Sequence, residues 1–431
     1  MITINRSQTL RRLLGLFSIV LIIGACKKEA DPIVDNGGVI IKLPHHWVTS
    51  LSDDKALVYA AVSTPIRYAG ENVLVGARKN QLRSIMSINA LTGFKNWEWQ
   101  DALSITADPT YRDPFDIGRN RYFLSTKYLF FPYNTSSYFI DLTTGQTQSK
   151  YKTNLARFDI TGGIGDQFFS AGGTYLKDDN ESLYMGRMAS GQPERLLFTP
   201  VYTSVVNPLP NGFGRILCIV PFESKGDTLL SILYTDPNAE AKVRATTVSA
   251  LYNLTKRMWS YERTIMNPDK DTWGAGNPVM QGQKVFYTSG LGIHCYDVMT
   301  GKTLWSFPAT QGFSSIVLAD GRLFTNCGDR YTYCLDPDTG QQIWKEESSG
   351  TSSPITYLNG ILYFLGGGDG KLHAIDAATG RHLWRLRSPD EDQNSGAFFY
   401  GVCVAVPGQS GQKGQIISTT GLNAYGYEAI H

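Results

Sequence analysis

Charged residues are scarce in this sequence. Lys, Arg, Asp and Glu make up 18% of its 431 residues, against about 25% in an average soluble domain. Glycine and aromatic residues are plentiful instead, with 43 Gly and 12% Phe, Trp and Tyr. Disordered chains have the opposite composition, and coiled coils carry dense charge along their helices. The composition therefore excludes both classes and favours an all-β protein with many tight turns.

The sequence also lacks the basic excess that a nucleic-acid surface requires. Its 40 Lys and Arg nearly balance its 38 Asp and Glu, and the first 25 residues hold three of the arginines and no acid. Without that segment no net positive charge remains to attract phosphates. We expect no nucleic-acid partner.

No apolar run near the N-terminus is long enough to span a bilayer. The run Leu13–Ile23 has only 11 residues and follows Arg6, Arg11 and Arg12, whereas a membrane span needs about 20 residues. A short apolar run behind basic residues is typical of a secretory signal. It ends in Ile23-Gly24-Ala25-Cys26, which resembles the lipobox of bacterial lipoproteins.

The lipobox resemblance implies that residues 1–25 are a signal peptide and that Cys26 is lipidated after cleavage. An ordinary signal peptide with a chance cysteine is the alternative. Residues 26–43 are polar and rich in turn formers at first, so we expect a flexible tether. By resemblance to lipoprotein sorting, Lys27 favours the outer membrane, with the body facing the periplasm or the cell surface. Residues 44–431 are expected to form a single domain.

Cysteine offers neither a disulfide framework nor a redox motif. Apart from Cys26 the chain has five cysteines, an odd number, widely spaced and with no C-x-x-C pair. Cys295 and Cys334 occupy the same column of a repeat described next. We interpret them as small packing residues rather than as a reactive pair.

One motif recurs three times at intervals of 39 and 40 residues, in 295–305, 334–344 and 374–384. In the pattern, a small residue precedes Asp by two positions, Thr-Gly follows, and Trp comes eight residues after Asp. The pairs Asp320-Gly321 and Asn359-Gly360 mark tight hairpins between copies. This period and these hairpins are typical of one four-stranded antiparallel sheet per repeat.

Four worn copies lie upstream, in 87–97, 140–149, 188–195 and 249–259, the last with Trp259 but without Asp and Gly. An eighth unit matches at 421–427, but the chain stops before its Trp would come, while Trp47 lacks a unit of its own. We therefore predict an eight-bladed β-propeller whose ring closes where residues 44–50 pair antiparallel with the strand of Ala424. Seven blades is the alternative, if one degenerate unit is not a blade. The tryptophans expected to dock neighbouring blades are Trp47, Trp97, Trp259, Trp305, Trp344 and Trp384.

This repeat resembles the tryptophan-docked repeat of the pyrroloquinoline-quinone (PQQ) β-propellers, over about residues 44–431 and most strongly over 272–387. One branch of that family comprises quinone-dependent alcohol and glucose dehydrogenases. The other comprises cofactor-free lipoproteins of the BamB type, which belong to the outer-membrane β-barrel assembly machine. The dehydrogenase branch implies two adjacent cysteines, a calcium-holding set of Glu, Asn and Asp, and a catalytic Asp. No two cysteines are adjacent here and no segment matches the calcium motifs.

We therefore expect no catalytic residue, no metal site and no cofactor. His294 and His373 share a repeat column two blades apart, and we expect both on strand surfaces. Gly366–Gly370 is glycine-rich, but no helix follows to bind a phosphate, so we interpret it as the turn between the second and third strands of a blade.

Three loops are longer than the repeat requires. One contains Tyr111, Arg112, Asp113 and Phe115, one spans 222–244, and one contains Trp273. Aromatic and charged residues in long loops suit a binding surface, although tolerated insertions would look the same. We predict a lipid-anchored scaffold of the cell envelope that binds a protein partner. A propeller that binds a carbohydrate or small ligand is the alternative, and a degenerate PQQ-dependent dehydrogenase is a third.

Overall fold

In a computed structural model of the chain, the described part comprises residues 39–430 except 54–65, 69, 80–81, 102–121, 134–135, 153–158, 173–180, 189–191, 201, 203–213, 238–244, 267–277, 290–291, 310–315, 350–352, 393–397 and 410–412. Regular structure in this part is almost entirely β-strand, with one 3-10 helix, η1 (Pro389–Asp392). Within the same residues, no helix has the length and apolar character needed to cross a membrane.

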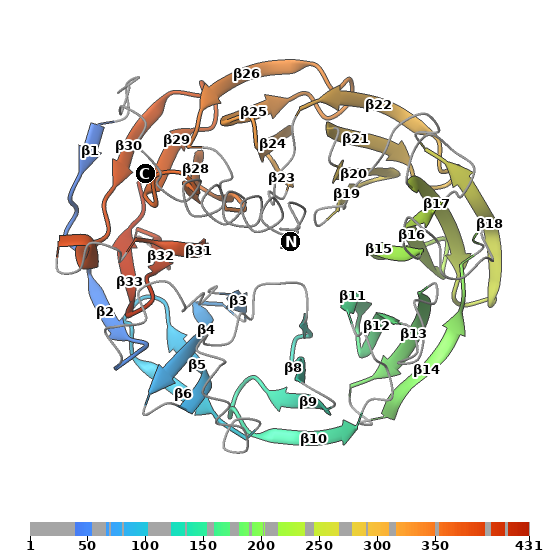
Figure 1. The fold of residues 1–431 in the computed structure, drawn as a ribbon, viewed down its shortest axis with the longest axis horizontal. Helices are drawn as coiled ribbons and strands as arrows, with labels where there is room; N and C mark the ends of the chain where they lie inside the picture. Colours follow the sequence, from blue (N-terminus) through green and yellow to red (C-terminus); the bar gives the residue numbers. More distant parts are fainter. Residues whose placement is uncertain are drawn as a thin grey trace, which may run out of the picture. The chain divides into compact units, whose positions relative to one another are not determined.

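The strands form eight sheets arranged around a ring (Figure 1), so the prediction of an eight-bladed all-β propeller is confirmed. Each blade is an antiparallel sheet of four strands ordered from the centre to the perimeter. Blades are numbered here in chain order. The first four comprise β3 (Ile66–Tyr68), β4 (Asn72–Lys79), β5 (Leu82–Asn89) and β6 (Lys95–Trp99); β7 (Phe123–Leu124), β8 (Tyr128–Tyr133), β9 (Ser136–Asp141) and β10 (Thr147–Lys152); β11 (Asp159–Ile164), β12 (Gln167–Gly172), β13 (Ser182–Arg187) and β14 (Gln192–Phe198); and β15 (Arg215–Ser224), β16 (Asp227–Pro237), β17 (Ala245–Asn253) and β18 (Met258–Ile265).

The second half of the chain supplies three complete blades and most of a fourth. These are β19 (Val279–Gln281), β20 (Lys284–Ser289), β21 (Gly292–Asp297) and β22 (Thr303–Pro308); β23 (Ile316–Ala319), β24 (Arg322–Asn326), β25 (Tyr331–Leu335) and β26 (Gln342–Glu347); β27 (Thr356–Leu358), β28 (Ile361–Leu365), β29 (Leu372–Asp376) and β30 (His382–Leu386); and, in blade 8, β31 (Tyr400–Val406), β32 (Gln415–Thr419) and β33 (Asn423–Glu428).

The N-terminal part of the chain completes blade 8 and closes the ring. Strand β2 (Trp47–Ser50) pairs antiparallel with β33, with Trp47 opposite Gly426 and Thr49 opposite Ala424. This is the predicted closure between residues 44–50 and the strand of Ala424. It covers the edge of β33, which would otherwise be open to pairing with another chain.

A second N-terminal strand was not predicted. Residues Val39–Ile41 form β1, which pairs in parallel with the outer strand β30 and gives blade 7 a fifth strand. Ile41 and Leu43 pack against the apolar cluster shared by blades 7 and 8. The expectation that residues up to 43 form a free tether is therefore wrong for the segment 39–43, because the compact unit begins at Val39.

Tryptophans of the outer strands bridge neighbouring blades. The indole Nε1 of Trp305 in blade 5 donates to the carbonyl of Pro337 in blade 6, at 3.1 Å. The ring lies flat on Gly340, where an added Cβ would come within 2.6 Å of it. Only glycine fits there, since Gly340 also has a φ of 72°. The same bond joins Trp47 to Ala90, Trp97 to Leu142 and Trp344 to Ala377, at 2.8, 2.9 and 3.1 Å.

Blade 4 departs from this arrangement, because Trp259 contacts the preceding blade 3 and does not bond to the following blade 5. Tyr261 takes the place of the tryptophan, because its hydroxyl donates to the carbonyl of Val298 at 3.2 Å. Its ring also lies near Gly301 of blade 5, where an added Cβ would come within 2.9 Å of Cε2, although Oγ of Ser249 is nearer. Trp259 packs instead against Phe198, with ring centroids 4.6 Å apart.

The turn of blade 4 explains the misalignment. Asn253 lies eight residues before Tyr261 and takes the place of the aspartate, since its Oδ1 accepts from the backbone N–H of Lys256 at 2.9 Å. Arg257 stands where the other turns have glycine and has a φ of 56°. Aligning the unit on Trp259 therefore shifts the register by two residues.

Candidate binding surface

The residues predicted to bind a partner or a lipid lie outside the described part of the chain. Tyr111, Arg112, Asp113 and Phe115 fall within 102–121, Trp273 falls within 267–277, and Cys26 precedes Val39. A candidate surface has to be built from the described residues alone. The third long segment, 222–244, is described in large part.

The segment that begins at Phe222 is a hairpin rather than the expected loop. Strands β15 and β16 have 10 and 11 residues, and a two-residue turn joins them at Lys225 and Gly226. Both turn residues have positive φ, 51° and 81°, which is the type I′ geometry that fits the twist of a hairpin. This turn joins the first and second strands, so it projects from the face opposite the turns between second and third strands. The predicted position on the binding rim is wrong for residues 222–227.

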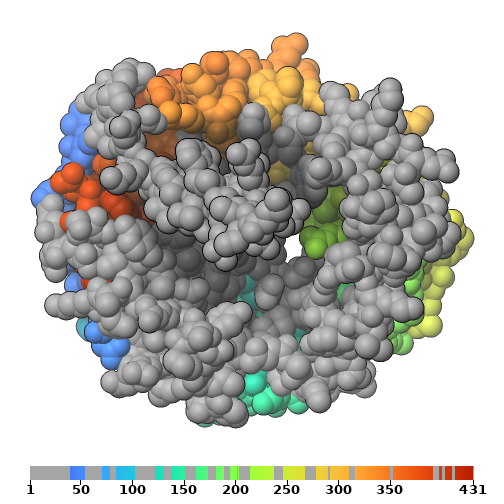
Figure 2. All heavy atoms as spheres, viewed as in Figure 1, coloured from blue at the N-terminus to red at the C-terminus, as the bar shows by residue number. Residues whose placement is uncertain are grey.

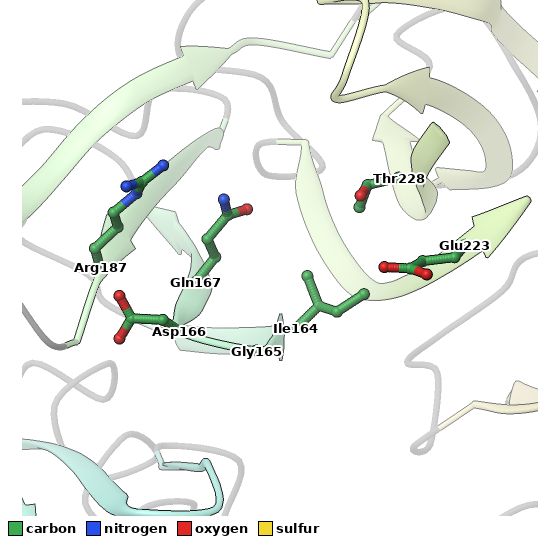
Figure 3. A pocket seen from close by; sticks show the side chains of 7 residues that line it. All are labelled: Ile164, Gly165, Asp166, Gln167, Arg187, Glu223 and Thr228. Atoms are coloured by element: carbon green, nitrogen blue, oxygen red, sulfur yellow. The ribbon is translucent and has the colours of Figure 1, made fainter. Parts of the chain in front are cut away.

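A small polar pocket lies beside this hairpin, between blades 3 and 4 (Figure 3). Its volume is about 260 Å³. Asp166, Gln167 and Arg187 come from blade 3, and Glu223 and Thr228 come from blade 4. The remaining lining residues are Ile164 and Gly165. Carboxylates, an amide, a hydroxyl and a guanidinium could hydrogen-bond a small polar ligand, and no sequence motif indicated this site.

The two blades can approach closely here because of a glycine. A Cβ at Gly162 on β11 would lie 2.9 Å from the carbonyl oxygen of Ile219 on β15. Arg187 occupies the position that aspartate holds in the regular repeats, four residues before the turn glycine. The pocket is therefore a product of the irregular blades, where the repeat has lost its capping acid.

Buried polar groups connect blades 6 and 7 on the opposite face. His373 on β29 is 1% exposed, so the expectation of a surface histidine is wrong. Its Nε2 lies 3.1 Å from Asp369, and its Nδ1 lies 3.1 Å from Nε2 of His382. Burial alone would raise the pKa of Asp369, but the hydrogen bond from His373 and its charge lower it to about 2. Burial lowers the pKa of His382 to about 3.

This series of hydrogen bonds includes a serine, a histidine and an aspartate, but the order in which they are bonded does not suit nucleophilic catalysis. The Oγ of Ser349 donates to Oδ1 of Asp369 at 2.9 Å, whereas an activated serine donates to an imidazole nitrogen. Both nitrogens of His373 already contact Asp369 and His382. The arrangement holds the turn 366–370, which the structure confirms as the connection between β28 and β29.

His294 in blade 5 is also buried rather than on the surface. It is 4% exposed, with Nε2 at 2.8 Å from the hydroxyl of Ser289 and Nδ1 at 2.9 Å from that of Ser306. Each ring nitrogen therefore has a hydroxyl partner. Among the described residues, no group of three or more His, Cys, Asp and Glu is placed to hold a metal ion.

The cysteines are buried thiols. Cys295 and Cys334 are both 0% exposed, and burial raises their pKa values to about 12 and about 11. A thiol with such a pKa is protonated at neutral pH and is a poor nucleophile. Cys218, Cys327 and Cys403 are likewise buried, and none of these five described cysteines forms a disulfide. None of these five cysteines is adjacent to another in the sequence, unlike the cysteine pair expected of a quinone site.

The blade that closes the ring has its own buried carboxylate. Asp390 in η1 is 2% exposed and accepts hydrogen bonds from the hydroxyls of Tyr425 and Thr420, at 2.6 and 2.5 Å. The amide of Asn423 lies 3.1 Å from the same carboxylate. The connection from blade 7 is therefore fastened to β33, the strand that β2 covers.

A family model described as outer membrane protein assembly factor BamB matches residues 244–399. That span begins beside β17 and covers blades 5, 6 and 7, where the Asp, Gly and docking positions are most regular. Residues 244–399 are therefore similar to this family, within a chain that folds as an eight-bladed propeller. The matched span also includes β17 and β18 of blade 4, whose turn has the same geometry with different residues.

A curated dehydrogenase is also similar to part of this chain. A lanthanide-dependent methanol dehydrogenase of Methylacidiphilum fumariolicum is 24% identical over 146 residues, which cover 27% of this chain and 24% of the enzyme. The chain thus matches only about a quarter of that relative's length.

Among solved structures, the quinohemoprotein alcohol dehydrogenase ADHIIG of Pseudomonas putida HK5 is 11% identical, with a TM-score of 0.59, and the match covers 89% of this chain and 76% of that one. BamB of Moraxella catarrhalis is 13% identical, with a TM-score of 0.44 and coverage of 74% and 82%. At 11% identity, the likeness to the alcohol dehydrogenase shows a shared fold and no more.

Proposed function

We propose that this protein is a non-catalytic, lipid-anchored propeller of the bacterial cell envelope that acts as a scaffold for a protein partner. The observation that carries the proposal is the match of residues 244–399 to the BamB family model. The groups in this region that resemble catalytic sets have structural partners, as Asp369 does with Ser349 and His373. In this region the contacts between blades are regular and the potentially reactive side chains are hydrogen-bonded to one another. Such a region is better suited to binding than to catalysis.

The anchor in this proposal is Cys26, with the outer membrane as the target and the periplasm or the cell surface as the compartment. The partner surface includes the loops that contain Tyr111, Arg112, Asp113, Phe115 and Trp273. The partner is an envelope protein, and the balanced charge disfavours a nucleic acid. No cofactor is required for such a role.

Co-purification from membranes tests this function. The intact protein should sediment with the outer membrane and bring a stoichiometric envelope protein with it after mild solubilisation. The Cys26→Ser variant should be released from the membrane, because it lacks the sulfur to which lipid would be attached. An intact protein that carries no lipid by mass spectrometry, or that purifies without any envelope protein, would contradict the proposal.

A ligand-binding propeller is the second candidate, and the pocket between blades 3 and 4 favours it. Its polar lining suits a sugar or another small polar molecule. Binding of a glycan that is lost in the Glu223→Ala variant would support this candidate. A dye-linked alcohol dehydrogenase assay with added PQQ and calcium or a lanthanide addresses the third candidate, and we expect no activity.

A further inference from the structure

The N-terminal strand β1 shows that the outer edge of a blade can accept an extra strand. It lies outside β30 (Figure 1), with Val39 beside Trp384 and Ile41 beside Leu386. The backbone N–H of Arg387 donates to the carbonyl of Ile41 at 3.3 Å. An extended apolar segment is therefore held in parallel by main-chain bonds and by packing of Ile41 and Leu43.

The outer strand of blade 6 has the same geometry as that of blade 7. In blade 7 Trp384 pairs with Ala374, and in blade 6 Trp344 pairs with Cys334; in both, a register shift follows at once. Blade 5 repeats this with Trp305 and Cys295. The three outer strands therefore present equivalent edges, of which only that of β30 is covered by another described strand.

Exposed apolar side chains mark the two open edges. Leu383 of blade 7 is partly buried against the cluster that includes Ile41 and Leu43. The equivalent residues, one position before the docking tryptophan, are Leu304 and Ile343, which are 49% and 47% exposed. Among the described residues, no strand covers the outer edges of blades 5 and 6 as β1 covers that of blade 7.

The outer strands of blades 5 and 6 differ at one position, where blade 5 has a proline. The position of Arg387, whose N–H bonds to β1, corresponds to Pro308 in β22 and to Glu347 in β26. Proline has no N–H to donate and is a common way to block an edge strand. Blade 6 retains the amide, so β26 is the better acceptor of the two.

Charge favours a basic residue in the incoming strand. β26 ends in Glu346 and Glu347, whereas the equivalent positions in blade 7 are Leu386 and Arg387. In the register of β1, Lys42 follows Ile41 and would stand beside Glu347 if the same peptide lay on blade 6. Figure 2 shows atoms of blade 6, in orange, at the perimeter of the ring, where a partner could reach this edge.

We propose that the outer edge of β26 is a strand-acceptor site for an extended segment of a partner protein, which adds in parallel. The segment has apolar residues beside Trp344 and Glu346 and a lysine or arginine beside Glu347. Main-chain hydrogen bonds supply affinity, and the exposed Ile343 with Glu347 supplies specificity. The carboxylate of Glu346 faces blade 7 instead, with Oε1 at 3.7 Å from Nδ1 of His382. This inference rests on the proposed scaffold function and names the kind of partner that it binds.

The test uses a fluorescent peptide with the sequence of residues 37–43, Gly-Gly-Val-Ile-Ile-Lys-Leu, and the full chain in detergent. The Ser348 N–H bonds to the carbonyl of Arg330 across the sheet, at 2.6 Å, so by the alternation of antiparallel pairs the Lys345 N–H faces outward. Lys345→Pro therefore removes an outward donor without breaking the ladder of the blade, and Lys345→Ala is the matched control. The proline variant should lose at least about tenfold in affinity, which is about 1.4 kcal/mol.

The peptide could instead displace β1 from blade 7, and Arg385→Pro on β30 distinguishes that outcome. Binding that is lost in Arg385→Pro but kept in Lys345→Pro would overturn the proposal, as would no binding to the intact chain. Thermal unfolding checks that each variant is folded. If Lys345→Pro is not, Glu347→Lys takes its place, and weaker binding of the lysine peptide with stronger binding of a Lys-to-Glu peptide is expected. The scaffold function is tested separately by membrane co-purification, so a negative peptide result would leave it standing.

Discussion

Blades 5 to 7 and blades 2 to 4 have the same architecture but keep the repeat to different degrees. In blade 6, Asp336 caps the turn by accepting from the N–H of Thr339 at 2.8 Å, Gly340 adopts positive φ, and Trp344 bonds to the next blade. In blade 4, the corresponding residues are Asn253, Arg257 and Tyr261. Every role is filled, but no residue is the same. The position relative to the turn is therefore preserved, whereas the side chain at that position can change.

The largest effect is expected in blade 8, which takes its fourth strand, β2, from the N-terminal part of the chain. Removing residues 27–52 deletes β1 and β2 and leaves the edge of β33 open. We expect aggregation or loss of the folded monomer, because an uncovered edge pairs with other chains. Removing residues 27–38 is the matched control and should leave the thermal unfolding temperature unchanged. A soluble, cooperative monomer without residues 27–52 would mean that the ring does not depend on β2.

Replacing the aromatic residues that join neighbouring blades should have the next largest effect on the free energy of unfolding. Trp344→Ala should lower the free energy of unfolding by about 3 kcal/mol, the lower end of the range for removing a large aromatic side chain, because Trp344 is only half-buried. Tyr261→Ala should cost a comparable amount in blade 4, and Trp259→Ala should cost less than Tyr261→Ala. Urea denaturation of the three variants measures these values. The reverse order for Tyr261 and Trp259 would restore Trp259 to the docking position.

The hydrogen-bonded histidines of blade 7 give that blade a pH-dependent stability. The pKa of His382 falls from 6.5 to about 3 on folding, so between these values the unfolded chain binds a proton that the folded chain does not. Stability should therefore fall as pH drops from about 6.5 towards 3, with a slope of up to about 1.4 kcal/mol per pH unit. The depressed pKa of Asp369 adds a further loss below about pH 4. His382→Gln should flatten the unfolding curve above pH 4, and an unchanged slope would contradict this assignment.

Substitutions at the turn position that is usually glycine should have the smallest effects on stability. We expect them to destabilise blade 6 and to stabilise blade 4. Gly340→Ala should destabilise blade 6, because the new Cβ would meet the ring of Trp305 at 2.6 Å. Arg257→Gly should stabilise blade 4 by about 1 kcal/mol, since Arg257 pays for a left-handed conformation that glycine adopts freely. Differential scanning calorimetry would detect both shifts, and a destabilised Arg257→Gly variant would show that this side chain has a role of its own.

The sequence was sufficient for the fold because the signal was periodic. The repeat length, the hairpin pairs and the missing eighth Trp together predicted eight blades and the pairing of residues 44–50 with the strand of Ala424. The position of Tyr261 was missed because alignment followed the most conspicuous residue, Trp259, instead of the turn. β1 was missed because three apolar residues beside a glycine-rich stretch carry no periodicity, and only the edge of β30 gives them a partner.

The candidate site was much less predictable. The pocket between blades 3 and 4 depends on Gly162, which permits close approach of β11 and β15, and on Arg187 in a column where the repeat has aspartate. Neither feature forms a motif. The burial of His294 and His373 also escaped prediction, because a histidine in a strand can satisfy both nitrogens with side chains of the next strand and turn, as His373 does with His382 and Asp369.

The central claim is that the ring closes through β2, and amide hydrogen exchange of the intact protein tests it most directly. The N–H of Leu51 donates to the carbonyl of Leu422 at 2.7 Å, and that of His46 donates to the carbonyl of Gly426 at 2.8 Å. These amides should exchange slowly and in step with those of β33, as members of one cooperative sheet. Exchange of residues 46–51 at unprotected rates, with β33 still protected, would contradict the account.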